Sequence, residues 1–184
     1  MKVDMDGNFE VTASPAETFA FITEPRTFAP ILPYFKELHS VEGDGFGVLL
    51  EVGVPQIRGR ADVAARRIES VPNERVVYTI NGRHALGMID ARMTFAIEPI
   101  EAGSRVNWTS EGTVSGTLAS LAQGILLPLA RRQVKSLVVA VQKELGVVQL
   151  EPAASPSLMK RSVSSMKGLF GAARAKSPNE DLSS

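Results

Sequence analysis

The chain has 184 residues, 44% of them hydrophobic, and its basic and acidic residues balance to a formal net charge of zero. It contains no cysteine, which excludes disulfides, thiol nucleophiles and cysteine-ligated metal centres. No apolar run approaches the roughly 18–20 residues of a membrane-spanning helix. Acids slightly outnumber bases before residue 150, so we expect no nucleic-acid partner. The N-terminus carries early acids and no apolar block, which predicts a cytoplasmic protein without a signal peptide.

A strand followed by two short helices opens the chain. Phe9, Val11 and Ala13 alternate with polar residues, as in a strand with one buried face. The next residues, Ser14-Pro15-Ala16-Glu17, have the pattern of a capping box, in which serine and glutamate satisfy each other's backbone amides at a helix start. This helix should end before Pro25. Residues 27–33 are interrupted by two prolines and predict only one or two helical turns.

Five further runs alternate apolar and polar residues with a period of two, which predicts strands. They are residues 46–54, 58–66, 76–80, 89–97 and 106–110. Turn signals separate them at Glu42-Gly43-Asp44-Gly45, Pro72-Asn73, Asn81-Gly82 and Glu101-Ala102-Gly103. The short spacings favour hairpins, so we expect one antiparallel sheet, polar outside and apolar inside.

The last regular element, Gly116–Leu145, has apolar residues at steps of three and four, as in an amphipathic helix. Because it is the only element large enough to cover the sheet, we expect it to lie over the apolar face. Pro128, with Gly124 before it, predicts a kink at about Gly124–Leu127. The kink either bends the helix around the sheet or makes the segment before it, Leu118–Ile125, a movable lid.

Several inward positions of the predicted sheet carry small residues, so helix and sheet can leave an apolar cavity suited to a lipid-like ligand. The inward aromatic residues fit two interpretations, ordinary core or the wall of a ligand cavity. The residues predicted to line such a cavity are Phe28, Leu32, Leu50, Val52, Val63, Tyr78, Ile80, Met93, Phe95, Trp108, Leu118, Leu121 and Ile125.

The order of elements resembles the α+β helix-grip fold of the START-like (SRPBCC) superfamily, a curved antiparallel sheet of about six to seven strands wrapped on a long C-terminal helix. More narrowly, residues 2–147 resemble CoxG, the family of the carbon monoxide dehydrogenase G-subunit. The residues that carry the resemblance lie in Phe9–Val11, Pro15–Ile22, Leu32-Pro33, Val54–Gly59, Asn81–Gly87, Gly116–Leu121 and Ala130–Arg132. Tyr34 departs from the pattern, because the family resemblance implies glycine after the leucine–proline pair.

The resemblance implies a non-catalytic accessory protein of a CO-dehydrogenase-like molybdenum hydroxylase. Such a protein is associated with membrane attachment or with carrying a quinone. We therefore expect no covalent cofactor, a hydrophobic cargo such as menaquinone or ubiquinone, and a cytoplasmic location on the inner face of the cell membrane. Two alternatives remain open: a ligand-free adaptor with a filled core, and an enzyme of the cyclase or hydratase kind. The enzyme would need polar groups in the cavity, and only Tyr78 and Ser110 have the right strand parity.

The chain divides into a domain over residues 1–148, a Pro/Ala/Ser linker over 149–156 and a tail over 157–184. The charged residues between Ser157 and Lys176 are all basic, and three of them, Lys160, Lys167 and Arg174, lie opposite an apolar face. A basic amphipathic helix of this kind is typical of interfacial membrane binding. Packing on a protein and disorder are the alternatives. The residues predicted to bind the membrane are Met159, Lys160, Val163, Met166, Lys167, Leu169, Phe170 and Arg174.

Other polar residues give weaker signals. His39 and His84 lack a second ligand at helical metal spacing, which predicts ordinary surface or loop histidines and no metal site. Asp90 and Glu111 have the parity of the outer, solvated face of the sheet. The basic strip Arg58, Arg60, Arg66 and Arg67 either docks an acidic partner or forms cross-strand ion pairs.

Overall fold

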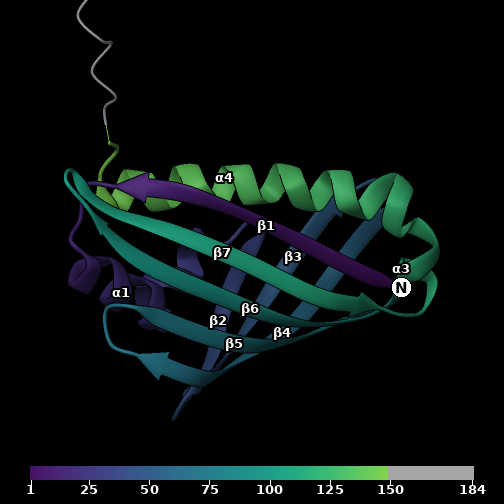
Figure 1. Ribbon diagram of the computed structural model, residues 1–184. Helices are drawn as coiled ribbons and strands as arrows, with labels where there is room; N and C mark the ends of the chain where they lie inside the picture. Colours follow the sequence, from purple (N-terminus) through teal and green to yellow (C-terminus); the bar gives the residue numbers. More distant parts are fainter. Residues whose placement is uncertain (149–184) are drawn as a thin grey trace, which may run out of the picture. The chain divides into compact units, whose positions relative to one another are not determined.

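A seven-stranded antiparallel sheet curves around one long helix in the computed structural model, which describes residues 1–148 (Figure 1). The strand order is β1-β7-β6-β5-β4-β3-β2, so the first and last strands are neighbours and β2 forms the far edge. The strands are β1 Lys2–Val11, β2 Phe35–Glu42, β3 Gly45–Val54, β4 Ile57–Val71, β5 Arg75–His84, β6 Gly87–Ile100 and β7 Gly103–Val114. The helices are α1 Pro15–Thr23, α2 Pro25–Phe28, the 3-10 turn η1 Ala29–Ile31, α3 Thr117–Leu121, the π-helical turn η2 Ala122–Leu126 and α4 Leu127–Leu145. This arrangement confirms the predicted helix-grip fold.

The capping box predicted at the start of α1 is present. The Glu17 backbone amide donates to Ser14 Oγ at 3.3 Å, and the Ser14 backbone amide donates to Glu17 Oε2 at 2.9 Å. Hydrogen bonds from the Ser14 side chain and backbone hold the pKa of the Glu17 carboxyl below its usual value. The helix ends at Thr23 because Pro25 follows the cap residue.

Three details of the sheet differ from the sequence-based expectation. The first strand begins at Lys2, because β1 pairs with β7 along its whole length. A strand that the alternation did not reveal, β2, pairs with β3 through two register shifts, which interrupt its period of two. The predicted turn at Asn81-Gly82 is wrong: β5 continues to His84, since Gly82 lies between Val63 and Ile89 as a paired strand residue. The chain turns three residues later, at Ala85-Leu86.

The C-terminal helix is interrupted where Pro128 predicts it. The π-helical turn η2 lies directly before α4, and Pro128 is in the first turn of α4. Proline has no backbone N–H to donate to the carbonyl one turn back, and its ring clashes with that carbonyl in a regular α-helix. The wider π turn before Pro128 relieves this clash. Figure 1 shows the chain changing direction between α3 and α4.

The apolar interior consists of two clusters: α3, η2 and Leu129 in the first turn of α4 belong to the smaller one, and the rest of α4 belongs to the larger one. The larger cluster joins the inner faces of β1 and of β4–β7 to α1 and α4. The smaller is built around buried Ile57, Val114 and Leu118 and takes in side chains of α3 and η2. At its far end α4 is fixed to the sheet, because the Ala13 amide donates to the Leu145 carbonyl at 3.0 Å.

Candidate functional site: an apolar cavity

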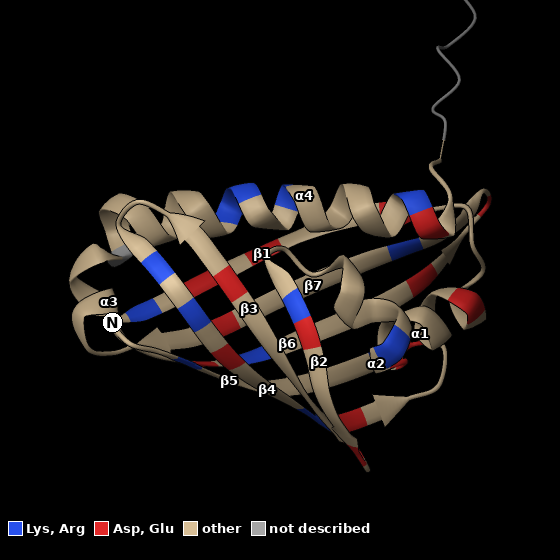
Figure 2. Ribbon diagram, turned by 180° about the vertical axis from the view of Figure 1, so that it is seen from behind, with Lys and Arg blue, Asp and Glu red and all other residues tan. Residues whose placement is uncertain are grey.

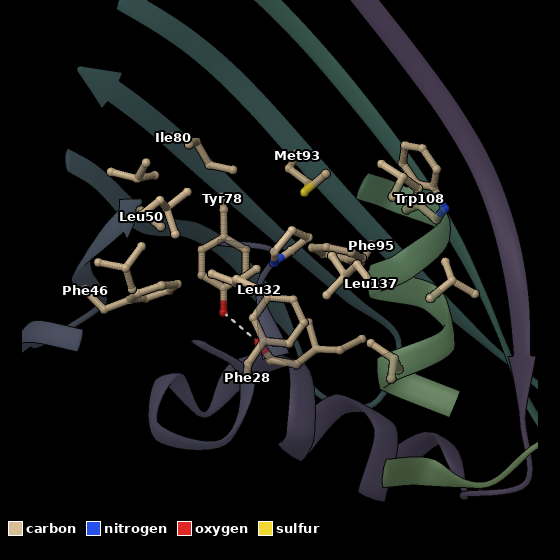
Figure 3. Close-up of a pocket in the computed structure, with 18 of the residues that line it drawn as sticks. Phe28, Leu32, Phe46, Leu50, Tyr78, Ile80, Met93, Phe95, Trp108 and Leu137 are labelled. Atoms are coloured by element: carbon tan, nitrogen blue, oxygen red, sulfur yellow. Dashed lines mark hydrogen bonds between the residues drawn. The ribbon is translucent and has the colours of Figure 1, made fainter. Parts of the chain in front are cut away.

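A cavity of about 210 Å³ lies inside the larger cluster, between the inner face of the sheet and α4 (Figure 3). The alternation along the strands points every second side chain at this space, and α4 contributes residues spaced by three and four. Phe28, at the end of α2, and Leu32 and Pro33, after η1, line one end of the cavity. Residues 28–34 form the mouth segment. The lining residues are Phe9, Ile22, Phe28, Leu32, Pro33, Phe46, Val48, Leu50, Val63, Ala65, Tyr78, Ile80, Met93, Phe95, Trp108, Val134, Leu137, Val138 and Val141.

Almost nothing polar faces this space. The Tyr78 hydroxyl already uses its proton within the protein, because it donates a hydrogen bond to the Ile22 carbonyl at 3.4 Å (Figure 3). Burial raises the pKa of Tyr78, while Arg67 lowers this pKa and Asp44 raises it to smaller extents, so the phenol stays protonated at neutral pH. Besides this hydroxyl, the lining side chains contain only one other polar group, the indole N–H of Trp108. The cavity therefore suits an uncharged, apolar group.

The size of the cavity limits what it can enclose. An apolar cavity of about 150 Å³ is known to stay dry and to bind benzene. A space of about 210 Å³ is large enough for one ring or a few branched carbons of a chain. A longer ligand would have to extend beyond the present walls or move them apart.

Aromatic side chains form much of the wall. Phe28 meets both Phe21 and Phe95 edge to face, with ring centroids 6.2 and 6.5 Å apart. Phe46 and Tyr78 make a similar contact at 6.2 Å. Such pairs favour a fixed geometry. Phe28 lies at the end of α2, between Pro25 and Pro30, so the mouth segment is held in place by ring contacts and by proline stiffness.

Tyr34 ties the mouth segment to α4. Its backbone has φ of +63°, the left-handed region that glycine adopts without strain, and this explains why the family resemblance implies glycine here. Its hydroxyl accepts a hydrogen bond from Gln133 Nε2 at 3.0 Å. Tyrosine at this position is less free than glycine to adopt the left-handed backbone, but its hydroxyl makes a direct hydrogen bond to α4, the helix that covers the cavity.

Most of the predicted cavity residues do lie together around this space. They are Phe28, Leu32, Leu50, Val63, Tyr78, Ile80, Met93, Phe95 and Trp108. The other four, Val52, Leu118, Leu121 and Ile125, belong to the smaller cluster. The predicted lid is therefore misplaced, because the segment before the kink packs on Ile57 and Val114 away from the cavity, and α4 covers the cavity instead.

Sequence reasoning missed the other lining residues, although the signal for many was present. Phe46 and Val48 share the parity of Leu50, and Ala65 shares that of Val63. The helical residues follow the steps of three and four that defined α4 as amphipathic. The missed residues are Phe9, Ile22, Pro33, Phe46, Val48, Ala65, Val134, Leu137, Val138 and Val141.

The remaining polar candidates form no second site. Among the described residues, no group of three or more His, Asp or Glu could hold a metal ion. His84 Nδ1 accepts from the Leu86 amide at 3.1 Å, and its Nε2 is the one buried side-chain polar atom without a partner in residues 1–148. Asp90 is exposed and accepts from Asn81 at 2.6 Å, whereas Glu111 lies opposite Arg92 in the register. In the basic strip, Arg67 pairs with Asp44.

No helix within residues 1–148 is both long enough and apolar enough to cross a membrane. The predicted linker, residues 149–156, and the predicted membrane-binding tail, residues 157–184, lie outside the described part of the chain.

The curved sheet and the long C-terminal helix, with an apolar cavity between them, define the helix-grip fold. Within it, the chain belongs to the CoxG family: the family described as the G-subunit of carbon monoxide dehydrogenase matches residues 7–146. Among curated proteins, none matches.

Solved structures of low sequence identity share the fold. A conserved protein from Geobacillus kaustophilus is 19% identical, with a TM-score of 0.72 over 78% of this chain and 95% of its own. A protein from Chromobacterium violaceum is 17% identical, with a TM-score of 0.59 over 77% and 96% of the two chains. The di-domain aromatase/cyclase StfQ of the steffimycin biosynthetic pathway is 12% identical, with a TM-score of 0.55 over 80% of this chain and 53% of its own. At these identities the likeness establishes the fold alone.

Proposed function

We propose that this protein is a non-catalytic carrier that holds a hydrophobic ligand in its cavity and links a CO-dehydrogenase-like molybdenum hydroxylase to the membrane. The observation that supports this most strongly is the apolar cavity between α4 and the sheet. An adaptor that used only surface contacts would have no need for such a space, since filling it would stabilise the domain.

Membership of the CoxG family supports the partner, because the family's description associates it with carbon monoxide dehydrogenase. A quinone such as menaquinone or ubiquinone is the cargo we favour. Its isoprenoid tail is branched and apolar and matches walls made of aliphatic and aromatic side chains. A cavity of about 210 Å³ would enclose part of that tail, and the remainder would extend outward.

The main rival is an enzyme, which the fold of the StfQ aromatase/cyclase brings into consideration. Proton transfer needs an acid or base positioned in the cavity with a pKa near the working pH. The one hydroxyl among the lining residues belongs to Tyr78, which is bonded to a backbone carbonyl and has a raised pKa. The other predicted polar residue, Ser110, does not line the cavity. The lining thus favours carriage over catalysis.

The test is to purify the full chain from its own host and examine it by native mass spectrometry and by solvent extraction. We expect a bound quinone or another lipid, released on denaturation. Protein that carries no lipid, and does not take up added quinone, would exclude the carrier function. Protein that converts the extracted compound would support the enzyme instead.

The link to the membrane is proposed to run through the tail. Deleting residues 157–184 should strongly reduce co-sedimentation of the protein with anionic vesicles, because the basic amphipathic segment is lost. Unchanged co-sedimentation would show that the tail has another role.

A further inference from the structure

One face of α4 is basic and points away from the sheet. With 3.6 residues per turn, the exposed residues Pro128, Arg131, Arg132, Lys135, Val139 and Lys143 fall within an arc of about 120°. The opposite side of the same helix lines the cavity with Val134, Leu137, Val138 and Val141. Figure 2 shows basic residues along α4 and a single acidic position close to its C-terminal end.

None of the four cations on this face has an ion-pair partner within the described chain. Several cations elsewhere do: Lys36 pairs with Glu51, Arg75 with Glu69, and Arg105 with Glu10 at 2.7 Å. Unpaired cations collected on one helix face create a local positive potential in a chain whose net charge is zero. A negatively charged surface is the complement of this face.

An exposed apolar side chain lies inside the basic face. Val139 is 65% exposed, the highest value among the large exposed hydrophobic residues of the described chain. Pro128 is exposed on the same face, one helical turn before Arg132. A helix face that carries basic residues with an apolar side chain among them is the pattern of interfacial membrane binding. Apolar and basic residues together on a helix of 19 residues, about 28 Å long, therefore favour a bilayer.

A groove beside this face leads toward the cavity. It runs between β1 and α4, has a volume of about 600 Å³, and is bordered by Arg131, Lys135 and Val139 of the basic face and by Asp4 and Asp6 of β1. Trp108, Val134 and Val138 line both the groove and the cavity, so these three side chains form the wall between the two spaces.

The β1 side of the groove is not hydrogen-bonded to α4. Met1 and Val114 exchange backbone hydrogen bonds. The backbone N–H and C=O groups of the odd-numbered residues of β1 therefore point toward β7, and those of the even-numbered residues point toward the free edge of the sheet. At that edge the Glu10 carbonyl accepts from Gln142 Nε2 at 3.0 Å. Between Asp4 and Asn8 no hydrogen bond joins β1 to α4 in the described structure, so the two elements can separate there without losing one.

We propose that the outer face of α4 docks on an anionic lipid bilayer, with Arg131, Arg132, Lys135 and Lys143 on the phosphate groups and Val139 inserted between lipids. In this orientation the β1–α4 groove opens at the bilayer and is the route by which an apolar ligand passes the Trp108 wall. The proposal rests on the carrier function above for its ligand, but the docking itself does not require a ligand. Docking by α4 adds to binding by the tail, because two linked contacts raise each other's effective concentration.

The experiment compares two matched triple charge reversals in the full chain. Arg131→Glu/Arg132→Glu/Lys135→Glu removes the basic face, and Arg58→Glu/Arg60→Glu/Arg66→Glu changes the net charge equally on exposed residues of β4. With phosphatidylglycerol vesicles we expect the α4 variant to bind at least tenfold more weakly, whereas the β4 variant changes about twofold or less. Vesicles of phosphatidylcholine should bind little of either. Equal losses in both variants would mean a response to net charge alone and would overturn the proposal.

A second variant tests the apolar contact and keeps the result independent of charge reversal. Val139→Asp should weaken vesicle binding severalfold, and Ser136→Asp, which adds the same charge at an exposed position of the same helix outside the basic face, should weaken it less. Equal effects of the two substitutions would contradict insertion of Val139. Binding of an acidic protein with no change in vesicle binding would assign the face to a protein partner and overturn the proposal.

Measuring the transfer of a quinone from vesicles to the protein distinguishes the docking proposal from the proposed carrier function. Uptake of a quinone from vesicles should slow in the α4 variant, and binding of a short-chain quinone in free solution should not change. Failure of the unmodified protein to bind any quinone would remove the carrier function and leave the vesicle result standing. Normal quinone uptake from vesicles by the α4 variant would overturn the proposed ligand route at the docked face and leave the carrier function standing.

Discussion

The two parts of the C-terminal helix have the same apolar periodicity and different surroundings. The first part, α3 with η2, packs among the aliphatic side chains around Ile57 and Val114. The second, α4, faces aromatic rings of the sheet and a small residue, Ala65, within the lining, and a cavity remains between them. Periodicity therefore tells which face of a helix is buried, and the side chains opposite decide whether the buried space is filled.

The largest contrast in stability should come from truncating leucine in each part. Leu118→Ala removes a side chain that is 2% exposed in the filled cluster, so we expect a loss of about 3 kcal/mol in the free energy of unfolding. Leu137→Ala faces space that already exists, and we expect about 1 kcal/mol. Urea denaturation of both variants measures the difference. Equal losses would mean that the two environments are packed alike.

A larger side chain that fills the cavity should weaken ligand binding and leave the stability of the fold nearly unchanged. Ala65→Leu places a larger side chain in the space, so we expect at least tenfold weaker binding of a hydrophobic ligand, with stability changed by about 1 kcal/mol or less. The control is Ala64→Leu, the neighbouring position on the exposed face of the same strand. Calorimetric titration with a short-chain quinone gives both affinities. Unchanged affinity in Ala65→Leu would place the ligand elsewhere.

The hydrogen bond between Tyr34 and Gln133 fixes the mouth segment to α4. The smaller cluster around α3 and η2 has no corresponding side-chain hydrogen bond in the described chain. Tyr34→Phe keeps the ring and removes the hydroxyl that accepts from Gln133. We expect a loss of about 1 kcal/mol in stability and faster release of a bound ligand. Gln133→Leu should give the same change in release rate, and combining the two should add little. Additive effects in the double variant would show that the two residues act separately.

The smallest effect concerns α1, which brings Ile22 to the cavity wall. Because hydrogen bonds from Ser14 lower the pKa of Glu17, its ionised form stabilises the fold above the unfolded-state value of about 4.5. This contribution should fade as the pH falls through the lower pKa of the folded state. Glu17→Gln should therefore have a lower Tm than the unmodified chain at pH 7 and the same Tm near pH 2. A Tm difference that persists in acid would assign the effect to packing.

The fold could be predicted from the sequence because its signals are local and repeated. The capping box at Ser14 and Glu17, the alternation of the strands and the turns at Gly43, Pro72-Asn73 and Ala102 each required only neighbouring residues. The failures depended on distant partners. Gly82 resembles a turn residue until its pairing with both Val63 and Ile89 is known. In β2, register shifts against β3 interrupt the alternation that would have revealed the strand.

The site was predictable in part for the same reason. Strand parity identified Tyr78, Met93 and Phe95 as lining residues, because parity fixes the face of a sheet. The choice between Leu118 and Leu137 as helix residues at the cavity depended on where the π turn redirects the chain, and no local pattern encodes that. The sequence has Tyr34 in place of an expected glycine, but the left-handed backbone there and the bond to Gln133, 99 positions away, became visible only in the structure.

The central claim is that the cavity takes a hydrophobic ligand, and the chain contains its own reporter. Trp108 is the only tryptophan and lies in the cavity wall. Titrating the full chain with a short-chain quinone should quench its fluorescence saturably at one quinone per chain, and Ala65→Leu should abolish the saturable part. Quenching that rises linearly without saturation, or that is the same in Ala65→Leu, would contradict a ligand in the cavity.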